Sequence, residues 1–247
     1  MNKLGLIGFP LKHSFSQKYF SEKFEKENIE GYEYHLYELP SISELPKLLK
    51  EEEGLLGLNV TIPYKEQVIP FLDKLDPETA GKIGAVNVIK VEEDGTLTGY
   101  NSDYFGFANS LKRFVSKDVK KALVLGTGGA AKAVKAVLES MTIEFVSVSR
   151  TRREGVIAYE NLTEEVMAST HLIVNTTPLG TFPDVENAPD IPYHYLTASH
   201  YCYDLVYNPS ETAFMKKAAA FGAHIKNGME MLQGQAEAAW SIWQMQD

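Results

Sequence analysis

The feature that most constrains the fold of this chain is a glycine-rich turn between an apolar run and an alanine-rich helical pattern. Residues 121–134 read KALVLGTGGAAKAV. A strand, a tight turn and a helix in this order open a dinucleotide-binding unit. Gly126 permits the sharp turn, Gly128 lets backbone N–H groups approach a pyrophosphate, and Ala131 is small enough for packing of the helix on the strand. We expect the anion at the N-terminus of this helix.

A glycine turn by itself can also merely reverse the chain, so the segments after it carry the prediction. Strand-like runs follow at residues 144–149, 171–176, 201–206 and 224–226, with helix-like stretches between most of them. This alternation is typical of a parallel sheet in an α/β protein. Residues 153–162 show no amphipathic helix, so one crossover is expected to be short.

Size and charge limit what the chain can bind. Its 247 residues, 44% of them hydrophobic, can form one large core or two ordinary ones, and two domains are slightly favoured. A net charge of -9 argues against general binding of nucleic acid or membrane surfaces, because both are anionic, but allows a small anionic ligand. No apolar run approaches transmembrane length, and Pro10 interrupts the N-terminal one, which argues against a secretory signal.

Cys202 is the only cysteine. An internal disulfide and a cysteine-based metal cluster are therefore excluded, and no group of histidines and carboxylates suggests a metal site. A reducing, cytoplasmic location is the simplest expectation.

Polar side chains follow several predicted strands in the first hundred residues. A helix is expected to begin near Ser14 and Ser16, where one serine caps it or both hold a carboxylate. In the next predicted strand Asn59 and Thr61 share one face by period two, just before Lys65. Taken alone, this pattern also fits a half-exposed strand followed by a solvated lysine.

Helices are predicted next at residues 65–72 and 78–82, followed by a hairpin that turns at Asp94 and Gly95. Asp103 can be an ordinary N-cap of a helix over 104–114. In an open α/β sheet, however, the strand ends form the binding edge. The polar residues at or near strand ends are Asn59, Thr61, Lys65, Asn87, Asn101 and Asp103.

The end of the 144–149 strand indicates which dinucleotide is bound. An NAD-binding protein usually carries an acidic residue there, whereas this chain reads SRTRR over 149–153. Arginines bind a 2′-phosphate bidentately, and Ser149 and Thr151 can donate hydrogen bonds to it. The sequence therefore favours NADP, with Arg150 and Arg152 in the binding set and Glu154 as the one discordant charge.

The last predicted helix covers residues 229–244 and places Gln235 on its apolar stripe. A buried glutamine without a hydrogen-bond partner costs roughly 1–3 kcal/mol. A backbone carbonyl or a bound polyol can supply that partner. Tyr207, at the end of the 201–206 strand, is either a core or rim aromatic or lines a cleft between domains.

Taken together, these motifs resemble the shikimate dehydrogenase family over the whole chain. The matching pieces, in order, are Gly8 to Pro10 with His13, Ser14 and Ser16; Asn59, Thr61, Pro63 and Lys65; Gly84 to Asn87; Asn101 to Asp103; Gly126 to Ala131; Asp204 to Tyr207; and Gly228, Met231, Leu232 and Gln235. Seven pieces in the family's order are highly specific, although no single one would be.

The resemblance implies two α/β domains with an active site in the cleft between them. Residues 1–103 and 229–247 would form the N-terminal α/β substrate domain, and 104–228 a Rossmann-like doubly wound NADP-binding domain. Ser14 and Ser16 would hold the substrate carboxylate. The implied hydroxyl-binding set is Asn59, Thr61, Asn87, Asp103 and Gln235, with Tyr207 as a further substrate residue. The expected cofactor set is Gly126, Gly128, Gly129, Ala130, Ser149, Arg150, Thr151, Arg152, Thr177, Gly228 and Met231.

Lys65 and Asp103 are similar to the family's catalytic pair. The implied reaction is the reversible, NADP-dependent reduction of 3-dehydroshikimate to shikimate in aromatic amino-acid biosynthesis, with no metal. An ammonium suits the developing alkoxide, which needs positive charge and then a proton. The protein would be a monomer or a homodimer. Its only other partner would be the small-molecule substrate. Two departures are Ser149, where the family more often has asparagine, and the missing helix after Arg153, which predicts a shallower adenine pocket and modest cofactor affinity.

Three alternative functions are weighed, of which the first is a close one and the second belongs to a different class. A quinate/shikimate dehydrogenase using NAD is disfavoured by Ser16, where a bulkier threonine would be expected, and by the arginines after Ser149. A non-catalytic NADP-binding sensor would not need both Lys65 and Asp103. A tRNA-linked reductase would need a nucleophilic cysteine in its substrate domain, and Cys202 lies in the other half of the chain.

Overall fold

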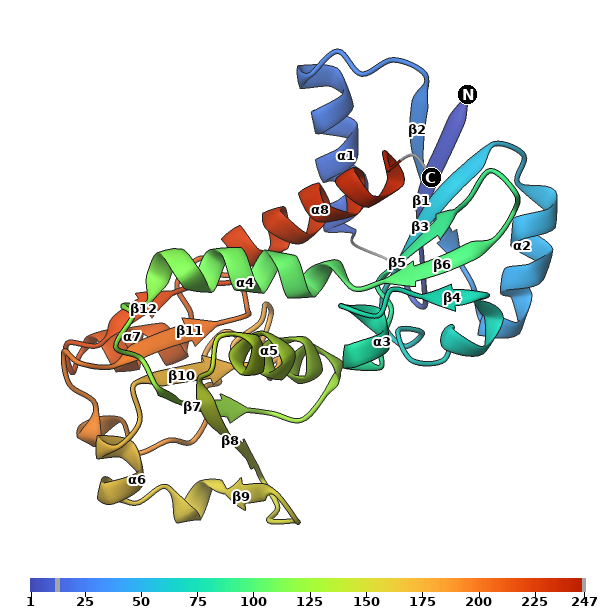
Figure 1. Cartoon of the computed structure of the whole chain (residues 1–247). Helices are drawn as coiled ribbons and strands as arrows, with labels where there is room; N and C mark the ends of the chain where they lie inside the picture. Colours follow the sequence, from blue (N-terminus) through green and yellow to red (C-terminus); the bar gives the residue numbers. More distant parts are fainter. Residues whose placement is uncertain (12–13, 246–247) are drawn as a thin grey trace. The chain divides into compact units, whose positions relative to one another are not determined.

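The computed structural model describes residues 1–11 and 14–245, so His13 of the serine motif lies outside the described residues. The chain folds into two compact units (Figure 1). Unit 1 comprises Met1–Ser102 with Gln235–Asp247, and unit 2 comprises Asp103–Gly234. The unit boundaries fall within two helices, after the first residue of α4 (Ser102–Phe114) and after Gly234 of α8 (Met229–Trp243).

Unit 1 is built on a mixed six-stranded sheet in the order β2-β1-β3-β5-β6-β4. The first three strands are parallel, whereas β5 is antiparallel to both β3 and β6. The bounds are β1 Asn2–Gly8, β2 Tyr32–Glu38, β3 Leu55–Val60, β4 Lys74–Leu75, β5 Val88–Val91 and β6 Leu97–Tyr100. The expected hairpin through Asp94 and Gly95 is confirmed.

The helices of unit 1 are α1 Phe15–Lys26, η1 Ile42–Glu44, α2 Leu45–Glu51, η2 Ile69–Phe71 and α3 Ala80–Ile83, together with the end of α8. One sheet face packs against α1 and α8 through Phe20, Ala239 and Trp243. The other face carries a separate core that includes Leu45, Leu58 and Ile89.

Two local predictions are wrong, one in unit 1 and one at the start of unit 2. Residues 65–72 form turns and the short η2 instead of a helix, because Pro70 lacks the backbone N–H donor that the interior of a helix requires. Asp103 is not an N-cap, since α4 begins at Ser102, two residues before the predicted start at 104, and Asp103 lies in its first turn.

Unit 2 contains a parallel sheet in the order β12-β11-β10-β7-β8-β9. The bounds are β7 Lys121–Leu125, β8 Glu144–Ser149, β9 Val156–Ala158, β10 Leu172–Asn175, β11 Tyr201–Asp204 and β12 His224–Lys226. Its remaining helices are α5 Gly129–Ser140, η3 Tyr159–Asn161, α6 Glu164–Ala168, η4 Tyr193–Tyr195 and α7 Ala213–Ala219. The alternating pattern therefore predicted the parallel sheet correctly.

The crossover from β8 to β9 is as short as predicted, because only residues 150–155 join these two parallel strands and no helix lies between them. The sequence pattern does not indicate β9 itself, since three residues are too few to show a period. Separate cores cover the two sheet faces, with Val134 and Leu138 of α5 on one and Phe214 of α7 on the other.

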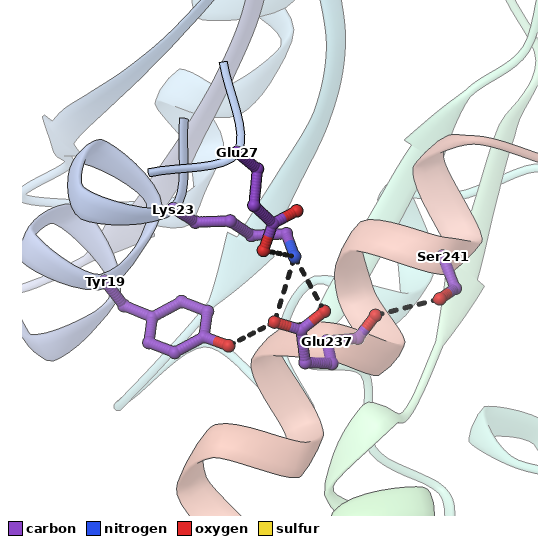
Figure 2. Close-up of polar contacts among 5 residues, drawn as sticks. All are labelled: Tyr19, Lys23, Glu27, Glu237 and Ser241. Atoms are coloured by element: carbon purple, nitrogen blue, oxygen red, sulfur yellow. Dashed lines mark hydrogen bonds and ion pairs between the residues drawn. The ribbon is translucent and has the colours of Figure 1, made fainter. Parts of the chain in front are cut away.

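A polar cluster fastens the end of α8 to α1 within unit 1 (Figure 2). The Lys23 ammonium contacts Glu237 and Glu27, each at 2.9 Å, and Tyr19 donates to Glu237. The Lys23 side chain is only 8% exposed. Burial alone would lower the pKa of Lys23, but the two carboxylates hold it above its usual value. Glu237 is thus the partner on α8 of a nearly buried cation.

None of the described helices is both long and apolar enough to cross a membrane.

The Figure 2 cluster predicts a measurable stability difference. Glu237→Gln removes a charge from a nearly buried ammonium, so the free energy of unfolding is expected to fall by about 1–2 kcal/mol. Glu22→Gln is the matched control, because Glu22 pairs with the exposed Lys18 and Lys26 on α1, and such pairs contribute about 0–1 kcal/mol. Urea unfolding measures both variants, and equal losses would contradict a special role for Glu237.

Candidate active site

The predicted substrate residues of unit 1 converge because of how its strands pair. β5 runs antiparallel to β3, so Asn87, just before β5, lies beside the end of β3, and the Val60 N–H donates to the Asn87 carbonyl at 2.9 Å. β6 is antiparallel to β5, so its end reaches the same edge, and the Asn87 N–H donates to the Tyr100 carbonyl at 3.0 Å. Segments far apart in sequence therefore meet at one sheet edge.

Asn59 and Asn87 are joined at this edge. Asn59 is 5% exposed and Asn87 is 3% exposed. The Asn59 Nδ2 donates to the Asn87 carbonyl at 3.3 Å, and Tyr34 Oη donates to Asn59 Oδ1 at 2.7 Å. Ser16 also lies within hydrogen-bonding reach of the Tyr34 hydroxyl, whose pKa is raised by burial. Tyr34 thus links Ser16 to Asn59, a role that its position inside β2 did not reveal.

Ser14, Thr61 and Lys65 lie at or near the same edge. Ser14 is the N-cap of α1, since its Oγ accepts the Gln17 N–H at 3.2 Å. The Thr61 N–H donates to the Ile7 carbonyl at 3.0 Å, at the end of β1. The Lys65 carbonyl accepts the Val86 N–H at 2.7 Å, which ties the lysine to the segment that carries Asn87. Lys65 and Thr61 are partly exposed.

Gln235 finds a partner that the sequence did not indicate. Its Oε1 lies 3.3 Å from Ser102 Oγ, so a side-chain hydroxyl takes the place of the backbone carbonyl considered from the sequence. Ser102 is fully buried and also bonds to Asn87. Only its place between Asn101 and Asp103 marked this serine in the sequence.

In unit 2 the candidate cofactor site lies where four parallel strands end. A cavity of about 340 Å³ is lined by Gly126 and Thr127 after β7, by Ser149 and Arg150 after β8, by Tyr159 after β9, and by Thr177, Pro178 and Leu179 after β10. The strand order reverses between β7 and β10. Open α/β sheets bind nucleotides at such a switch point, outside the carboxyl ends of the strands.

The glycine turn leaves room for a bound pyrophosphate. Gly126 has φ +107, and a Cβ there would approach Thr176 Oγ1 within 2.6 Å, so both backbone and space require glycine. A Cβ on Gly128 or Gly129 would meet no atom within 4 Å. Gly128 caps α5 without a side-chain hydrogen bond, and Ala130 follows in its first turn. Open N–H groups at the start of a twelve-residue helix fit an anionic group.

The arginine segment divides between two cavities. Arg150 lines the cavity at the strand ends, whereas Arg152 and Arg153 line a separate one beside Phe145 and Val156. The Ser149 hydroxyl donates to the Thr151 carbonyl at 2.7 Å, so in this structure it shapes the turn. Arg150 is thus the arginine of this segment that lines the same cavity as the glycine turn.

Tyr159 lines the cavity at the strand ends, but the sequence did not mark it as a site residue, because it follows β9, which was not predicted. Burial raises the pKa of Tyr159 above its usual value, and the nearby Arg150 partly offsets that rise.

Thr177 is held by a buried polar network. Its Oγ1 donates to Asn175 Oδ1 at 2.6 Å, and Asn175 Nδ2 donates to Asp204 Oδ1 at 2.9 Å. Asp204 also accepts from Thr212 at 2.6 Å and from the Val206 N–H at 3.0 Å. Burial raises the pKa of Asp204 to about 6. A carboxylate without solvent exposure therefore supports the loop after β10.

Three further predicted residues of unit 2, Gly228, Met231 and Tyr207, differ in their surroundings and exposure. Gly228 approaches the Leu205 carbonyl so closely that a Cβ would clash with it. Met231 is buried in the core that α5 covers. Tyr207 is 37% exposed, which excludes the core alternative for this residue. Among the residues that the structure describes, no group of three or more His, Cys, Asp or Glu could hold a metal.

The parallel sheet and the open glycine turn at its switch point place the chain in the class of dinucleotide-binding α/β proteins. Relatives from Caldanaerobacter subterraneus and Clostridium beijerinckii, both named shikimate dehydrogenase (NADP+), are 38% and 40% identical to it. The alignments cover 97% and 99% of this chain and 90% and 92% of the relatives. The chain belongs to the shikimate dehydrogenase family.

Further comparisons agree. Residues 6–89 match the family model described as the shikimate dehydrogenase substrate binding domain. A crystal structure of shikimate 5-dehydrogenase from Thermus thermophilus, in complex with NADP(H) and shikimate, is 31% identical, with a TM-score of 0.85. That alignment covers 99% of this chain and 94% of the Thermus chain.

The cavity predicts how cofactor choice depends on Arg150. Arg150→Asp places a carboxylate in this cavity, where the sequence predicts the 2′-phosphate, so we expect the KM for NADP+ to rise at least about tenfold more than that for NAD+. Arg153→Asp is the matched control, since Arg153 lines the other cavity. Steady-state kinetics with both cofactors measure the two ratios. Equal changes for NADP+ and NAD+ in Arg150→Asp would contradict recognition of the 2′-phosphate by this arginine.

The raised pKa of Asp204 predicts a pH effect on stability. Between the unfolded pKa of about 4 and the folded value of about 6, the folded state binds the proton more tightly. This group's contribution to the free energy of unfolding is therefore greatest below pH 4 and declines as pH rises to 6, by roughly 1–3 kcal/mol. Urea unfolding at pH 4–7 should show this decline in the unaltered protein relative to Asp204→Asn. Parallel pH profiles would contradict it.

Proposed function

We propose that this chain is an NADP-dependent oxidoreductase that reversibly reduces 3-dehydroshikimate to shikimate, a step of chorismate and aromatic amino-acid biosynthesis. The observation that carries this proposal is the hydrogen-bonded set of polar side chains at the sheet edge of unit 1, in a chain whose relatives are NADP-dependent shikimate dehydrogenases. Unit 1 is the substrate domain of the proposal, and unit 2 is its cofactor domain.

The polar edge of unit 1 fits a small ring that carries several hydroxyls and one carboxylate. Ser14 and Ser16, at the N-terminus of α1, suit the carboxylate because hydroxyls and the helix dipole both favour an anion. Amides donate and accept, so they suit hydroxyl groups. The residues proposed to bind the hydroxyls are Asn59, Thr61, Asn87 and Gln235, and Tyr207 is a further substrate contact.

Unit 2 fits NADP by its own features. Gly126, Gly128, Gly129 and Ala130 leave the start of α5 open for a pyrophosphate, and Arg150 lines the same cavity as Thr177. When bound, NADP supplies the hydride. The further contacts of the proposal are Ser149, Thr151, Arg152, Gly228 and Met231, of which Arg152 lines a neighbouring cavity.

Lys65 and Asp103 carry the proposed chemistry on the protein side. As the ketone carbon accepts a hydride, its oxygen gains negative charge and then a proton. The Lys65 ammonium supplies positive charge at that oxygen, and it carries a proton that it can donate to the alkoxide. Asp103, in the first turn of α4, orients the ammonium and bonds to the substrate.

We also propose that the protein acts in the cytoplasm, as a monomer or homodimer, with no nucleic-acid or membrane partner. The sequence holds a single cysteine and so forms no internal disulfide, which is the usual state of proteins in a reducing compartment. Cys202 is fully buried, and burial raises the pKa of its thiol to about 12, so the reactive thiolate is disfavoured.

The proposal predicts a large effect of removing the ammonium. Lys65→Ala is expected to lower kcat for shikimate oxidation by about 10²- to 10⁴-fold, because charge stabilisation and proton transfer are both lost. Lys82→Ala, an exposed lysine at the end of α3, is the control for general charge effects. Absorbance at 340 nm follows cofactor reduction, and circular dichroism checks the fold. Near-normal kcat in folded Lys65→Ala would remove Lys65 from the mechanism.

The unaltered protein provides the test of the function itself. Shikimate and quinate are each assayed with NADP+ and with NAD+. We expect the highest kcat/KM with shikimate and NADP+. Turnover of quinate with NAD+ at higher efficiency would instead support the quinate/shikimate alternative, and no turnover of shikimate with either cofactor would contradict the proposal.

A further inference from the structure

Ser102 is a fully buried residue that joins two amides of the candidate substrate site. Its N–H donates to Asn87 Oδ1 at 2.6 Å, and its Oγ accepts from Asn87 Nδ2 at 3.1 Å. The same Oγ lies 3.3 Å from Gln235 Oε1. These contacts connect the residue before β5, the first residue of α4 and the unit 1 part of α8.

The backbone of Asn87 is fixed independently of Ser102. Its N–H donates to the Tyr100 carbonyl, and its carbonyl accepts from Val60 and from Asn59 Nδ2. Only the rotation of the side-chain amide remains to be set. An amide can present its oxygen or its NH₂ group in either of two orientations, and the hydrogen-bond partners decide between them.

The number of hydrogens available at Ser102 determines which group of the Gln235 amide is left for a ligand. A serine hydroxyl has one hydrogen to donate and two lone pairs. The Ser102 hydroxyl lies 3.3 Å from both Asn87 Oδ1 and Gln235 Oε1. Because Asn87 Oδ1 already accepts the short bond from the Ser102 N–H, we assign the hydroxyl hydrogen to Gln235 Oε1. With Oε1 taken by Ser102, Gln235 offers its NH₂ group to a ligand. With the hydroxyl hydrogen on Gln235, Asn87 keeps one Nδ2 hydrogen and one Oδ1 lone pair for a ligand.

We propose that Ser102 is a positioning residue that sets the amide orientations of Asn87 and Gln235, so that Gln235 donates to a substrate hydroxyl oxygen. The inference rests on the proposed function and deepens it. Ser102 need not touch the substrate, because it acts through the two amides.

The attachment of α8 does not depend on this serine. Glu237 holds the same helix to α1 through Lys23 and Tyr19 (Figure 2), and Ala239 and Trp243 bury it against the sheet. Loss of the Ser102 hydroxyl should therefore free the Gln235 amide to rotate while α8 stays in place. A positioning role and a purely structural role thus make different predictions.

The test compares Ser102→Ala with Ser102→Thr and Ser102→Cys in shikimate oxidation. We expect Ser102→Ala to raise the KM for shikimate by about tenfold, with the KM for NADP+ within twofold of the unaltered protein. Ser102→Thr keeps the hydroxyl and should recover most of this loss. Ser102→Cys keeps a side chain of similar shape but a weaker hydrogen-bonding group, so it should resemble Ser102→Ala and provides a second variant if alanine impairs folding.

Ser110→Ala is the matched control. Ser110 is 1% exposed and accepts a 2.7 Å bond from the Tyr203 hydroxyl in unit 2, so an equally buried hydroxyl is lost away from the amides. We expect a lower Tm with an unchanged KM for shikimate. A double-mutant cycle adds the second readout, since Ser102→Ala should cost less in a Gln235→Ala background if it acts through Gln235.

Three results would overturn the inference. One is a KM for shikimate in Ser102→Ala and Ser102→Cys within twofold of the unaltered protein, and another is an equal KM increase in Ser110→Ala. Strict additivity of Ser102→Ala and Gln235→Ala is the third. These results leave the proposed function intact if the unaltered protein oxidises shikimate, whereas absence of that turnover would contradict both.

Discussion

The need of buried amides for hydrogen-bond partners is the constraint on which the candidate site depends. Asn59 and Asn87 lie almost wholly out of solvent, where an unpaired polar group costs roughly 1–3 kcal/mol. The structure satisfies them through Tyr34 and Ser102, so the amides that protein partners hold in place are the ones proposed to meet the substrate. The same hydrogen bonds therefore contribute to the stability of the fold and to the proposed substrate binding. A substitution of Asn59 or Asn87 is expected to affect both.

Strand order performs the corresponding task in unit 2. Four parallel strands end at one cavity because the chain returns from β9 to pair β10 with β7. Position alone then places Gly126, Arg150 and Thr177 together, although they are far apart in sequence. The buried Asp204 accepts a hydrogen bond from Asn175, which in turn accepts one from Thr177, so Asp204 helps to hold the loop after β10 in place. Backbone topology provides the convergence in both units, and a few buried polar bonds fix the details.

Sequence patterns predicted the parallel sheet, the hairpin and the short crossover, because these depend on local periodicity and turn residues. The 65–72 segment failed where the helical pattern was outweighed by Pro70. β9 and Tyr159 were missed since three residues carry no period. Tyr34 and Ser102 could not have been assigned, because their importance lies in partners such as Gln235, distant in sequence. Features that depend on neighbouring residues can thus be predicted from the sequence, whereas hydrogen bonds between residues distant in sequence cannot.

The missing helix between β8 and β9 has a consequence for how unit 2 forms. Ser147 and Val156 pair in parallel although they are close in sequence, whereas parallel neighbours are usually joined by a crossover of a dozen or more residues. A short loop closes at a small entropic cost, and low contact order speeds folding. The edge beside Arg150 is therefore the one expected to assemble early, before the long return to β10 is made.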